Sequence, residues 1–558
     1  MLLVLLAGVV YLSAVFHTRA DLTAEKRYTL SEPTRKLLSD LKNPVTITVF
    51  LEGELPSGFK KLRNSTRELL DEFKAYGGAN LKISFQKIAE GKEGQEKDQF
   101  LDSMARLGIK PYSIAISSKQ DESSEERVVI PGALIQSGEQ VRAINLLSGQ
   151  NSAELDYATI NSTEALLEYK FISAIQHVTV EKVPLVGYLL GNGETFSPNV
   201  KSLVEDVLMH QYNVRFLPVD SVPVIPPVFD ALVIMKPTIP FNDGQKLKID
   251  QYIMNGGKVL WLVDRLYAEM DSLMRKQSDF VAFDRNLNLD DQLFRYGVRI
   301  NPDLLQDLQS DKFPLVVGSV GDQPQMQLVD WPYFPLLNPS PNSPITKNLN
   351  KVLSIFPNTL DTVKVPGIKK TILLTSSENA RSLITPAFVS LNSVKTQEDL
   401  KTFNRAFVPV AALLEGEFPS LYSNRLGLGT LDSLSKVYNT PFRNKSVPNK
   451  MIVISDADIA TNVITQQEGP LEVGTNQFTK QQYANKDFLI NSMEYLVNPS
   501  GILETRAKDF TLRLLDPRKL EGNRPFWQVI NLAVPVALIL LFGMLFQYLR
   551  RRRYRSVN

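Results

Sequence analysis

Apolar and polar residues follow two different periods in the first part of the chain. Residues 45–51 (VTITVFL) and 81–85 (LKISF) are rich in β-branched residues or alternate between apolar and polar, which predicts two strands. Between them, apolar residues recur every three or four positions over 62–76, which predicts a helix. An earlier helix is predicted to begin at Ser31, which can cap it, with Pro33 in its first turn.

The same alternation continues to about residue 145. A helix is predicted around 98–107, then a strand at 113–117, and then two strands at 127–131 (RVVIP) and 141–145 (VRAIN) that pair as a hairpin. The resulting order β-α-β-α-β-β resembles a thioredoxin-like domain, although the chain has no cysteine pair for redox chemistry. We therefore expect a binding or scaffold version of that domain.

A second α/β unit is predicted after a linking helix at 163–176. Strands that alternate with helices indicate a parallel sheet of the Rossmann-like kind. The strands are expected at 182–190, 214–219, 231–235, 258–263, 351–353, 370–374 and 451–455, and the helices at 200–210, 243–254 and 483–496. The remaining segments are expected to be a partly helical charged surface at 264–312, a Pro-rich loop or arm at 313–345 and a polar stalk at 502–525.

Residues 526–549 are 24 consecutive positions without Asp, Glu, Lys or Arg. At ~1.5 Å per residue a helix of this length spans about 36 Å, more than the ~30 Å hydrocarbon core of a bilayer. The residues predicted to lie at the membrane interfaces are Phe526, Trp527, Tyr548, Arg550, Arg551, Arg552 and Arg553. The residues predicted to pack against a neighbouring helix are Gln528, Asn531, Gly543 and Gln547.

The segment 1–18 is also apolar and uncharged, and it is predicted to be an uncleaved transmembrane helix. A cleaved signal peptide is the alternative, but no basic residue precedes Leu2. With two spans, the positive-inside rule places both termini in the cytoplasm and residues 19–525 outside it. The predicted segments are a transmembrane helix (1–18), a thioredoxin-like domain (19–160), a second α/β domain (161–501), a stalk (502–525), a transmembrane helix (526–549) and a basic cytoplasmic tail (550–558).

Composition removes several classes of function. The 558-residue chain has no cysteine and three scattered histidines, which excludes disulfides and cysteine nucleophiles and argues against a His-rich metal site. Lys and Arg total 62 and Asp and Glu total 60, for a net charge of +2. Because five of the Arg stand in the last nine residues, the rest of the chain is slightly acidic, which argues against a nucleic-acid partner.

One segment looks like a catalytic motif. Asp456 and Asp458 follow a predicted strand, and a D-x-D at a strand end can hold Mg²⁺ and accept a phosphoryl group, as in haloacid-dehalogenase-like enzymes. That motif has a Thr where this chain has Ala460. We therefore expect these carboxylates to accept backbone hydrogen bonds in a turn.

A second segment, Gly191-Asn192-Gly193-Glu194, is half of a phosphate-binding loop, but the third Gly of that fingerprint would fall at Phe196. The strand at 231–235, where an amidotransferase-like fold would place its nucleophile, runs into Lys236-Pro237 and offers no thiol or hydroxyl. No Walker A or G-x-S-x-G sequence occurs. The prediction is therefore that the chain has no catalytic, cofactor-binding or metal-binding residues.

Five segments carry a resemblance to a known family: 21–31 (DLTAEKRYTLS), 45–77, 407–422 (FVPVAALLEGEFPSLY), 451–462 (MIVISDADIATN) and 485–496 (NKDFLINSMEYL). Across almost its whole length, the chain resembles the gliding-motility-associated ABC-transporter auxiliary proteins of Bacteroidota. The resemblance implies an inner-membrane subunit that acts with a multi-span permease (GldF-like) and an ATPase (GldA-like), linked to gliding motility and its secretion machinery. It also implies a domain related to glutamine amidotransferases at 180–265 without catalytic residues.

The sequence therefore predicts a non-enzymatic periplasmic subunit held by two membrane helices. Its partners would be the permease, through it the ATPase, membrane lipids and other gliding or secretion proteins. Two other classes remain open. One is a solute-binding protein that presents a ligand to the permease, and the other is a degenerate hydrolase that uses Asp456 and Asp458.

Overall fold

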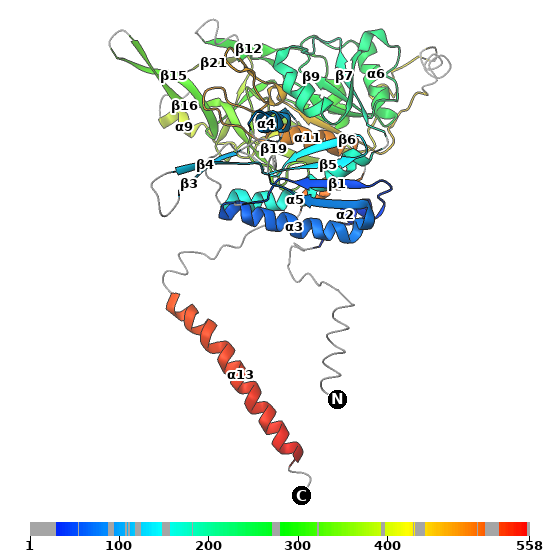
Figure 1. The fold of residues 1–558 in the computed structure, drawn as a ribbon. Helices are drawn as coiled ribbons and strands as arrows, with labels where there is room; N and C mark the ends of the chain where they lie inside the picture. Colours follow the sequence, from blue (N-terminus) through cyan, green and yellow to red (C-terminus); the bar gives the residue numbers. More distant parts are fainter. Residues whose placement is uncertain are drawn as a thin grey trace. The chain divides into compact units, whose positions relative to one another are not determined.

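The computed structural model describes residues 29–554, except for 54, 88–93, 107–108, 110–111, 118–123, 148–156, 181, 271–278, 321–322, 392–396, 424, 428, 430–440, 499 and 508–523. The chain divides into two units at residue 509, and each is described by itself. The first contains the sheets, and the second contains the long helix α13 (Figure 1). The predicted membrane helix at 1–18 lies outside the described residues.

A four-stranded mixed sheet in the order β2-β1-β5-β6 organises the N-terminal part of the first unit. β1 runs parallel to β2 and antiparallel to β5, which pairs with β6 in turn. The Ser31 hydroxyl accepts a hydrogen bond from the Thr34 N–H, so the first described helix begins where predicted. The bounds are α2 Glu32–Ser39, β1 Val45–Val49, α3 Ser57–Gly77, η1 Gly78–Asn80, β2 Leu81–Phe85, α4 Gln95–Arg106, β5 Gly132–Ser137, β6 Gln140–Asn145 and α5 Tyr157–Thr179.

The predicted hairpin between 127–131 and 141–145 is wrong. β4 (Ser124–Val129) instead pairs with β3 (Tyr112–Ser117), and β6 pairs with β5, a strand that the sequence reading missed. The reason lies in the turn: Gly138 has φ +58°, so the chain reverses between β5 and β6 at that glycine. The residues of β5 (GALIQS) carry too few β-branched side chains to identify the strand beforehand.

A ten-stranded sheet forms the second part, in the order β15-β16-β19-β22-β23-β10-β9-β7-β8, with β17 on β16. The strands from β23 to β8 are parallel, as the βα pattern predicted. The bounds are β7 Leu185–Leu190, η2 Pro198–Val200, η3 Leu203–Met209, β8 Asn213–Pro218, η4 Val219–Ser221, β9 Ala231–Met235, α6 Asp243–Met254, β10 Lys258–Leu262, β17 Val352–Leu353, β19 Ile368–Thr375, β22 Pro409–Gly416, β23 Asn449–Ile454, η6 Ala457–Ala460 and α11 Asn485–Val497.

Both faces of the parallel strands are buried. Tyr188 and Leu260 belong to the same core cluster as Phe488 and Leu489 of α11, whereas Trp261 belongs to the cluster on the other face, which includes residues of α6. Burial on both faces explains why these strands read as continuous apolar runs such as ALVIM. The first cluster also includes core residues of the N-terminal sheet, so the two parts of the first unit share one hydrophobic core.

Of the two alternatives predicted for the Pro-rich segment 313–345, a loop or an arm, the loop is wrong, because most of the segment is strand. β15 (Ser310–Val320) and β16 (Gln323–Pro339) form a long antiparallel hairpin. Pro335 lies where the pairing shifts register and Pro332 inside that irregular stretch, so neither breaks a regular ladder. Trp331 and Tyr333 are buried in an aromatic cluster with Phe313, which anchors the base of the hairpin.

The segment 264–312, predicted as partly helical surface, supplies several short strands as well as the helix α8, and Asp303–Asp307 is buried throughout. A three-stranded sheet in the order β11-β12-β21 is formed partly from it. The bounds of the remaining short elements are β11 Leu266–Tyr267, β12 Phe280–Asp284, α8 Asp290–Tyr296, β13 Val298–Ile300, β14 Asp303–Asp307, β18 Leu360–Thr362, β20 Ala380–Ile384, β21 Ala387–Val389, α9 Gln397–Lys401, β24 Ile464–Thr465 and β25 Gly469–Pro470.

The predicted stalk does not begin at residue 502. Residues Ile502–Ala507 form η7, in which Ile502 and Leu503 are buried in the core. Arg506 donates a hydrogen bond to Asn491 of α11 at 2.8 Å and lies over the ring of Tyr169 in α5. The folded body therefore continues through η7, and only the later part of the predicted stalk, 508–523, lies outside the described residues.

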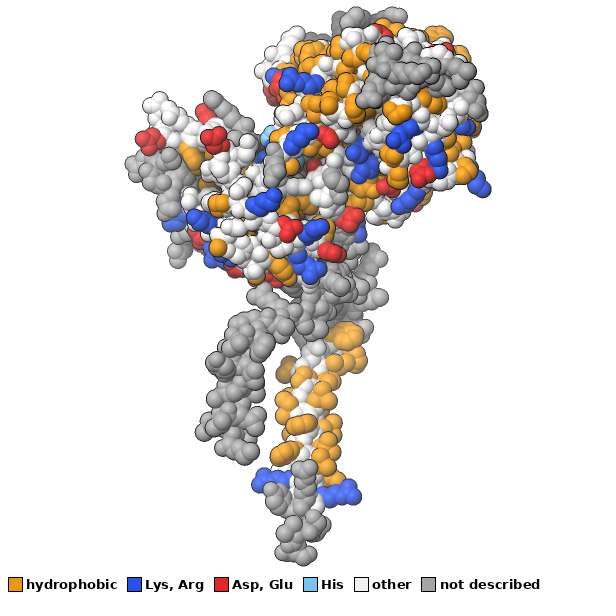
Figure 2. All heavy atoms as spheres, turned by 90° about the vertical axis from the view of Figure 1, so that its right-hand side faces the viewer, with side chains coloured by type: hydrophobic (Ala, Val, Ile, Leu, Met, Phe, Trp, Pro, Cys, Tyr) orange, Lys and Arg blue, Asp and Glu red, His pale blue; other side chains and the backbone are white. Residues whose placement is uncertain are grey.

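The second unit contains α13 (Arg524–Tyr554), which includes the predicted span at 526–549. Residues Phe526–Arg552 are long and apolar enough to cross a membrane, with a mean hydropathy of 2.6 over the most apolar 18-residue window. Apolar side chains cover this helix, and basic side chains gather at one end (Figure 2).

Candidate functional site

Three neighbouring parallel strands, β9, β10 and β23, end at the same edge of the large sheet. In an open α/β sheet, ligands bind outside this carboxyl edge, so the residues that follow the three strands are the first place to look for a site. Lys236 follows β9, Asp264 follows β10, and Asp456 and Asp458 follow β23. We call these residues, together with Glu269, the Lys236 cluster.

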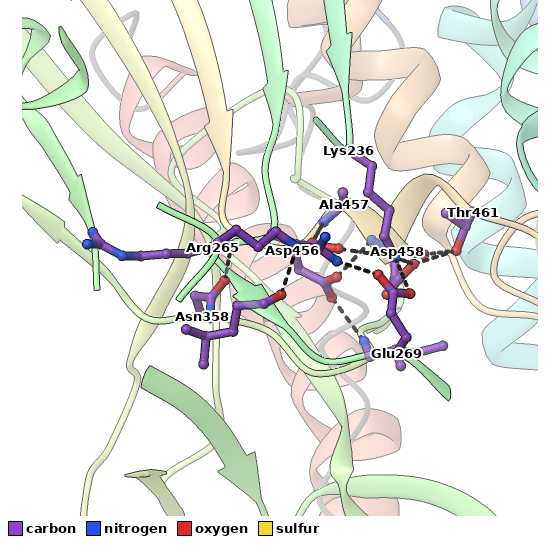
Figure 3. A network of polar contacts seen from close by, with 12 residues as sticks. Lys236, Arg265, Glu269, Asn358, Asp456, Ala457, Asp458 and Thr461 are labelled. Atoms are coloured by element: carbon purple, nitrogen blue, oxygen red, sulfur yellow. Dashed lines mark hydrogen bonds and ion pairs between the residues drawn. The ribbon is translucent and has the colours of Figure 1, made fainter. Parts of the chain in front are cut away.

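The ammonium group of Lys236 lies at the centre of the cluster (Figure 3). Its Nζ is 2.5 Å from Asp458 Oδ1, 3.1 Å from Asp264 Oδ2 and 3.2 Å from Glu269 Oε2. The backbone of Lys236 has φ +49°, an uncommon conformation for a residue with a Cβ. Its N–H donates to Leu262 O at 2.9 Å, which places it at the end of β10.

The carboxylates around Lys236 also hold backbone groups. Asp456 accepts hydrogen bonds from the Asp458 N–H at 2.8 Å, from the Ile355 N–H at 3.0 Å and from the Ser354 hydroxyl. Asp264 accepts one from the Ala457 N–H at 2.5 Å. The turn after β23 is therefore fixed by side chains. The prediction of a backbone-binding carboxylate is confirmed for Asp456, whereas Asp458 Oδ1 accepts hydrogen bonds from the side chains of Lys236 and Thr461.

Burial and mutual charge shift the pKa values within the cluster. Burial alone would lower the pKa of Lys236, but the carboxylates of Asp458, Asp264 and Glu269 outweigh it and raise that pKa well above its ordinary value. Burial raises the pKa of Asp458 to about 6, with Lys236 opposing the shift. Burial, together with the charges of Asp264 and Asp458, raises the pKa of Asp456 well above its usual range.

This arrangement has the chemistry of an internal ion-pair cluster. Lys236 is 8% exposed and Asp456 is fully buried, so the charged groups have little contact with solvent. The ammonium contacts Asp458 of the D-x-D but not Asp456, and among the described residues no set of three acidic or His side chains is arranged to bind a metal ion. The cluster therefore ties together the ends of three strands.

The predicted half of a phosphate-binding loop, residues 191–194, forms hydrogen bonds within the protein. Gly191 and Gly193 have φ +138° and +73°, and the Asn192 N–H donates to Glu194 Oε2 at 2.7 Å. The Asn192 carbonyl accepts the N–H groups of Thr238 and Ile239, both at 2.8 Å. The Asn192 N–H, a donor that could bind a phosphate, is thus taken by the Glu194 carboxylate, and the Asn192 carbonyl joins the loops after β7 and β9.

The predicted membrane residues all belong to α13, and the described side chains among them are exposed. Gly543 and Gln547 are four residues apart and lie on one face of the helix, whereas Asn531 is turned by about 160° from Gln547 at ~100° per residue. The four predicted packing residues therefore do not form one line. A shallow, mostly apolar groove on α13 is lined by Gln528, Val529, Leu532, Ala533, Val536, Ala537 and Leu540.

The interface residues lie at the two ends of this helix. Phe526 and Trp527 pack their rings edge to face at 5.6 Å near the first turn, and Tyr548 lies near the last turns. Arg550, Arg551 and Arg552 are exposed, and the helix continues through Arg553.

Sequence reasoning found Asp456 and Asp458 but missed their partners. In the sequence, Lys236 marks only the end of the strand ALVIM, and neither Asp264 nor Glu269 belongs to a motif. A signal was available, because Lys236 and Asp264 each follow a buried apolar strand almost directly, and buried charges must be paired. What the sequence does not give is the strand order, which brings β23 next to β10 although about 190 residues separate them.

An α/β body with a buried ion-pair cluster is joined in sequence to a helix that is long and apolar enough to span a membrane. A family model described as an ABC-type uncharacterized transport system matches residues 184–492, more than half of the chain. The chain belongs to this family of ABC-transport auxiliary components. A separate model, Domain of unknown function (DUF7088), matches residues 24–136.

Comparison with solved structures gives a match described as "mmIFT52 N-terminal domain", at 12% identity and a TM-score of 0.30, which covers 56% of this chain and 97% of that one. No curated protein matches the chain.

Proposed function

We propose that this chain is a non-catalytic, membrane-anchored subunit of an ABC transporter of the gliding-motility type, similar to GldG of Bacteroidota. It would act with a GldF-like permease and, through it, a GldA-like ATPase, with its α/β body in the periplasm. The observation that carries the proposal is the family match over 184–492, which covers most of the ten-stranded sheet. The predicted thioredoxin-like domain at 19–160 is part of the same proposal, as a scaffold without cysteines.

The mechanism that we favour is mechanical. The resemblance assigns ATP hydrolysis to a partner, and the Lys236 cluster is closed by its own ion pairs. Movement of the permease would then reach the body through α13 and the segment before it. A solute-binding role gains no support from the pocket lined in part by Lys450, Tyr495 and Glu504, because its volume of about 130 Å³ is below the ~300–1,000 Å³ typical of ligand sites.

The test replaces residues 526–549 of the full chain with an unrelated 24-residue Leu/Ala span and keeps the Arg tail. If α13 contacts the permease, the permease should no longer co-purify from membranes although the variant inserts normally. In a matched control the native span is kept and each of the four residues Arg550, Arg551, Arg552 and Arg553 is replaced by Gln. This control separates lipid binding by the tail from helix packing. Full retention of the permease by the Leu/Ala variant would reduce α13 to a plain anchor.

A further inference from the structure

The three-stranded sheet β11-β12-β21 has apolar side chains on both faces. Residues Phe280 and Ala282 of β12 point inward and are buried. The alternate positions, which face outward, should be polar in an antiparallel sheet that has one face in water. Instead, the outer positions of the sheet are Tyr267, Val281, Phe283 and Phe388, which are 55%, 39%, 58% and 58% exposed.

These four outer residues form one continuous patch. Tyr267 lies directly opposite Phe283 across the β11–β12 pair, and Val281 lies directly opposite Phe388 across the β12–β21 pair. Val281 and Phe283 are two residues apart on β12, so the two pairs are neighbours on the same face. With 150–250 Å² for each aromatic side chain, the exposed area is about 350 Å², in the range of patches that are often functional.

The patch lies on a firm support. On the inner side, the ring of Phe280 contacts that of Phe356 at a centroid distance of 5.9 Å, within the aromatic cluster that includes Trp331. The Tyr333 hydroxyl of β16 donates to Phe388 O at 3.0 Å, which fixes β21 to the neighbouring hairpin (Figure 1). A rigid apolar surface loses little conformational freedom on binding, which favours association.

The charged groups around the patch, two Arg and three carboxylates, are held in ion pairs. Arg265 binds Asp284 at 3.0 Å and Asp290 at 2.6 Å. Arg285 binds Glu269, and its guanidinium lies 4.8 Å from the centre of the Tyr267 ring. The face therefore has an apolar centre and a polar rim that is already paired, as protein–protein interfaces do.

We propose that the outer face of the β11-β12-β21 sheet is a self-association surface that stacks on the same face of a second copy of this chain. A two-fold axis brings a surface against itself, so a rim with excess charge of one sign would repel its copy. The paired rim here avoids that repulsion. Sheets that stack face to face pack ~10 Å apart with interleaved side chains, which the four protruding residues fit.

The area is consistent with this partner. A standard interface buries ~800 Å² on each side, of which about 60% is apolar. The patch would supply most of that apolar part, and the exposed carboxylate of Asp290, paired with Arg265, belongs to the polar part. The proposal depends only on this face and would stand if no ABC transporter were involved.

The experiment uses the full chain in its native membranes, with two differently tagged copies expressed together. A photo-crosslinking phenylalanine analogue replaces Phe283 in one copy, and in a matched control it replaces Phe196, which is 61% exposed elsewhere on the body. We expect an adduct that carries both tags at Phe283, with at least tenfold higher yield than at Phe196. The substitution Phe388→Ser in the second copy should lower that yield severalfold.

Equal yields at the two positions would overturn the proposal, as would an adduct at Phe283 that contains only lipid or another protein. A second measurement covers the case in which the probe disturbs the fold. Light scattering of the purified full chain in detergent should give a dimer, and the double variant Phe283→Ser, Phe388→Ser should give a monomer with the melting temperature of the native protein. A native chain that is monomeric at every concentration tested would also overturn it.

Discussion

The substitution Lys236→Met tests whether the Lys236 cluster holds the sheet edge together. Methionine keeps the aliphatic stem and a Cβ, so the backbone strain of φ +49° is the same in both proteins and cancels. Only the ammonium group is lost, which leaves Asp264, Asp458 and Glu269 without their shared cation. The change therefore isolates the charge.

The magnitude follows from the distances. Three carboxylate oxygens lie 2.5–3.2 Å from Nζ, and at an effective dielectric constant of 20 each such contact is worth about 5 kcal/mol before desolvation is subtracted. Because the desolvation of Lys236 and its partners offsets most of this sum, the measured loss should be that of a broken buried ion pair, about 3–5 kcal/mol. That loss corresponds to an increase of roughly 100-fold to 3,000-fold in the equilibrium constant for local opening of the sheet edge.

The loss should depend on pH in a defined direction. In the native protein the pKa of Asp458 is raised to about 6, so its protonation stabilises the folded state below pH 6, and this contribution disappears as the pH rises through 6. Removing Lys236 removes the charge that opposes this shift, so the pKa of Asp458 rises further. We expect the penalty at pH 8 to exceed the penalty at pH 5.5 by at least ~1.4 kcal/mol, the equivalent of one pKa unit.

Hydrogen exchange of the full chain measures this locally, on peptides that cover β9, β10 and β23. A local readout suits a protein of this size, for which a single unfolding free energy is not well defined. The matched control is Lys445→Met, which removes an exposed ion pair with Glu417 and should cost less than ~1 kcal/mol. A loss below 1 kcal/mol at pH 8, or the same loss at both pH values, would refute the reasoning.

Three further predictions concern topology, chemistry and the hairpin. A reporter fused after Asn558 should be active only in the cytoplasm, and periplasmic activity would contradict the proposed orientation. The double variant Asp456→Asn, Asp458→Asn should lose ~1–3 kcal/mol of local stability, because backbone N–H groups and the Lys236 ammonium then face amides in place of carboxylates. It should still assemble with its partners at permissive temperature. Loss of function with an unchanged melting temperature would instead support the hydrolase hypothesis. Trp331→Ala should weaken hydrogen-exchange protection over 310–339 by ~3–5 kcal/mol, whereas Trp331→Phe should cost far less, since Trp331 Nε1 has no partner among the described residues.

The sequence predicted the parallel part of the fold well because burial on both faces leaves a strong signal. The helix predicted at 243–254 and the strand at 231–235 match α6 and β9 in both bounds. Their flanks carry clear boundary signals, since Asn242 caps α6 with a full capping box. Where local signals and tertiary packing agree, the prediction holds.

The wrong prediction of a loop at 313–345 has a physical cause. The hairpin β15–β16 was expected to be loop because it is rich in proline, but proline opposes a strand only where its missing N–H would be needed in the ladder. Pro332 falls in an irregular stretch of the pairing, and the aromatic side chains around it gain burial in a cluster with Phe313 and Phe356. Packing between distant segments therefore outweighs local propensity there.

In the candidate site, too, contacts between residues close in the sequence were predictable, and contacts between distant residues were not. The turn that begins at Asp456 was predictable as a place where a carboxylate accepts a backbone N–H group, because the contact joins residues two positions apart. The cation that neutralises it was not predictable, because Lys236 reaches Asp458 only after β10 has been placed between β9 and β23. A D-x-D that would suggest a metal site in the sequence is thus closed by an ammonium group from 222 residues away.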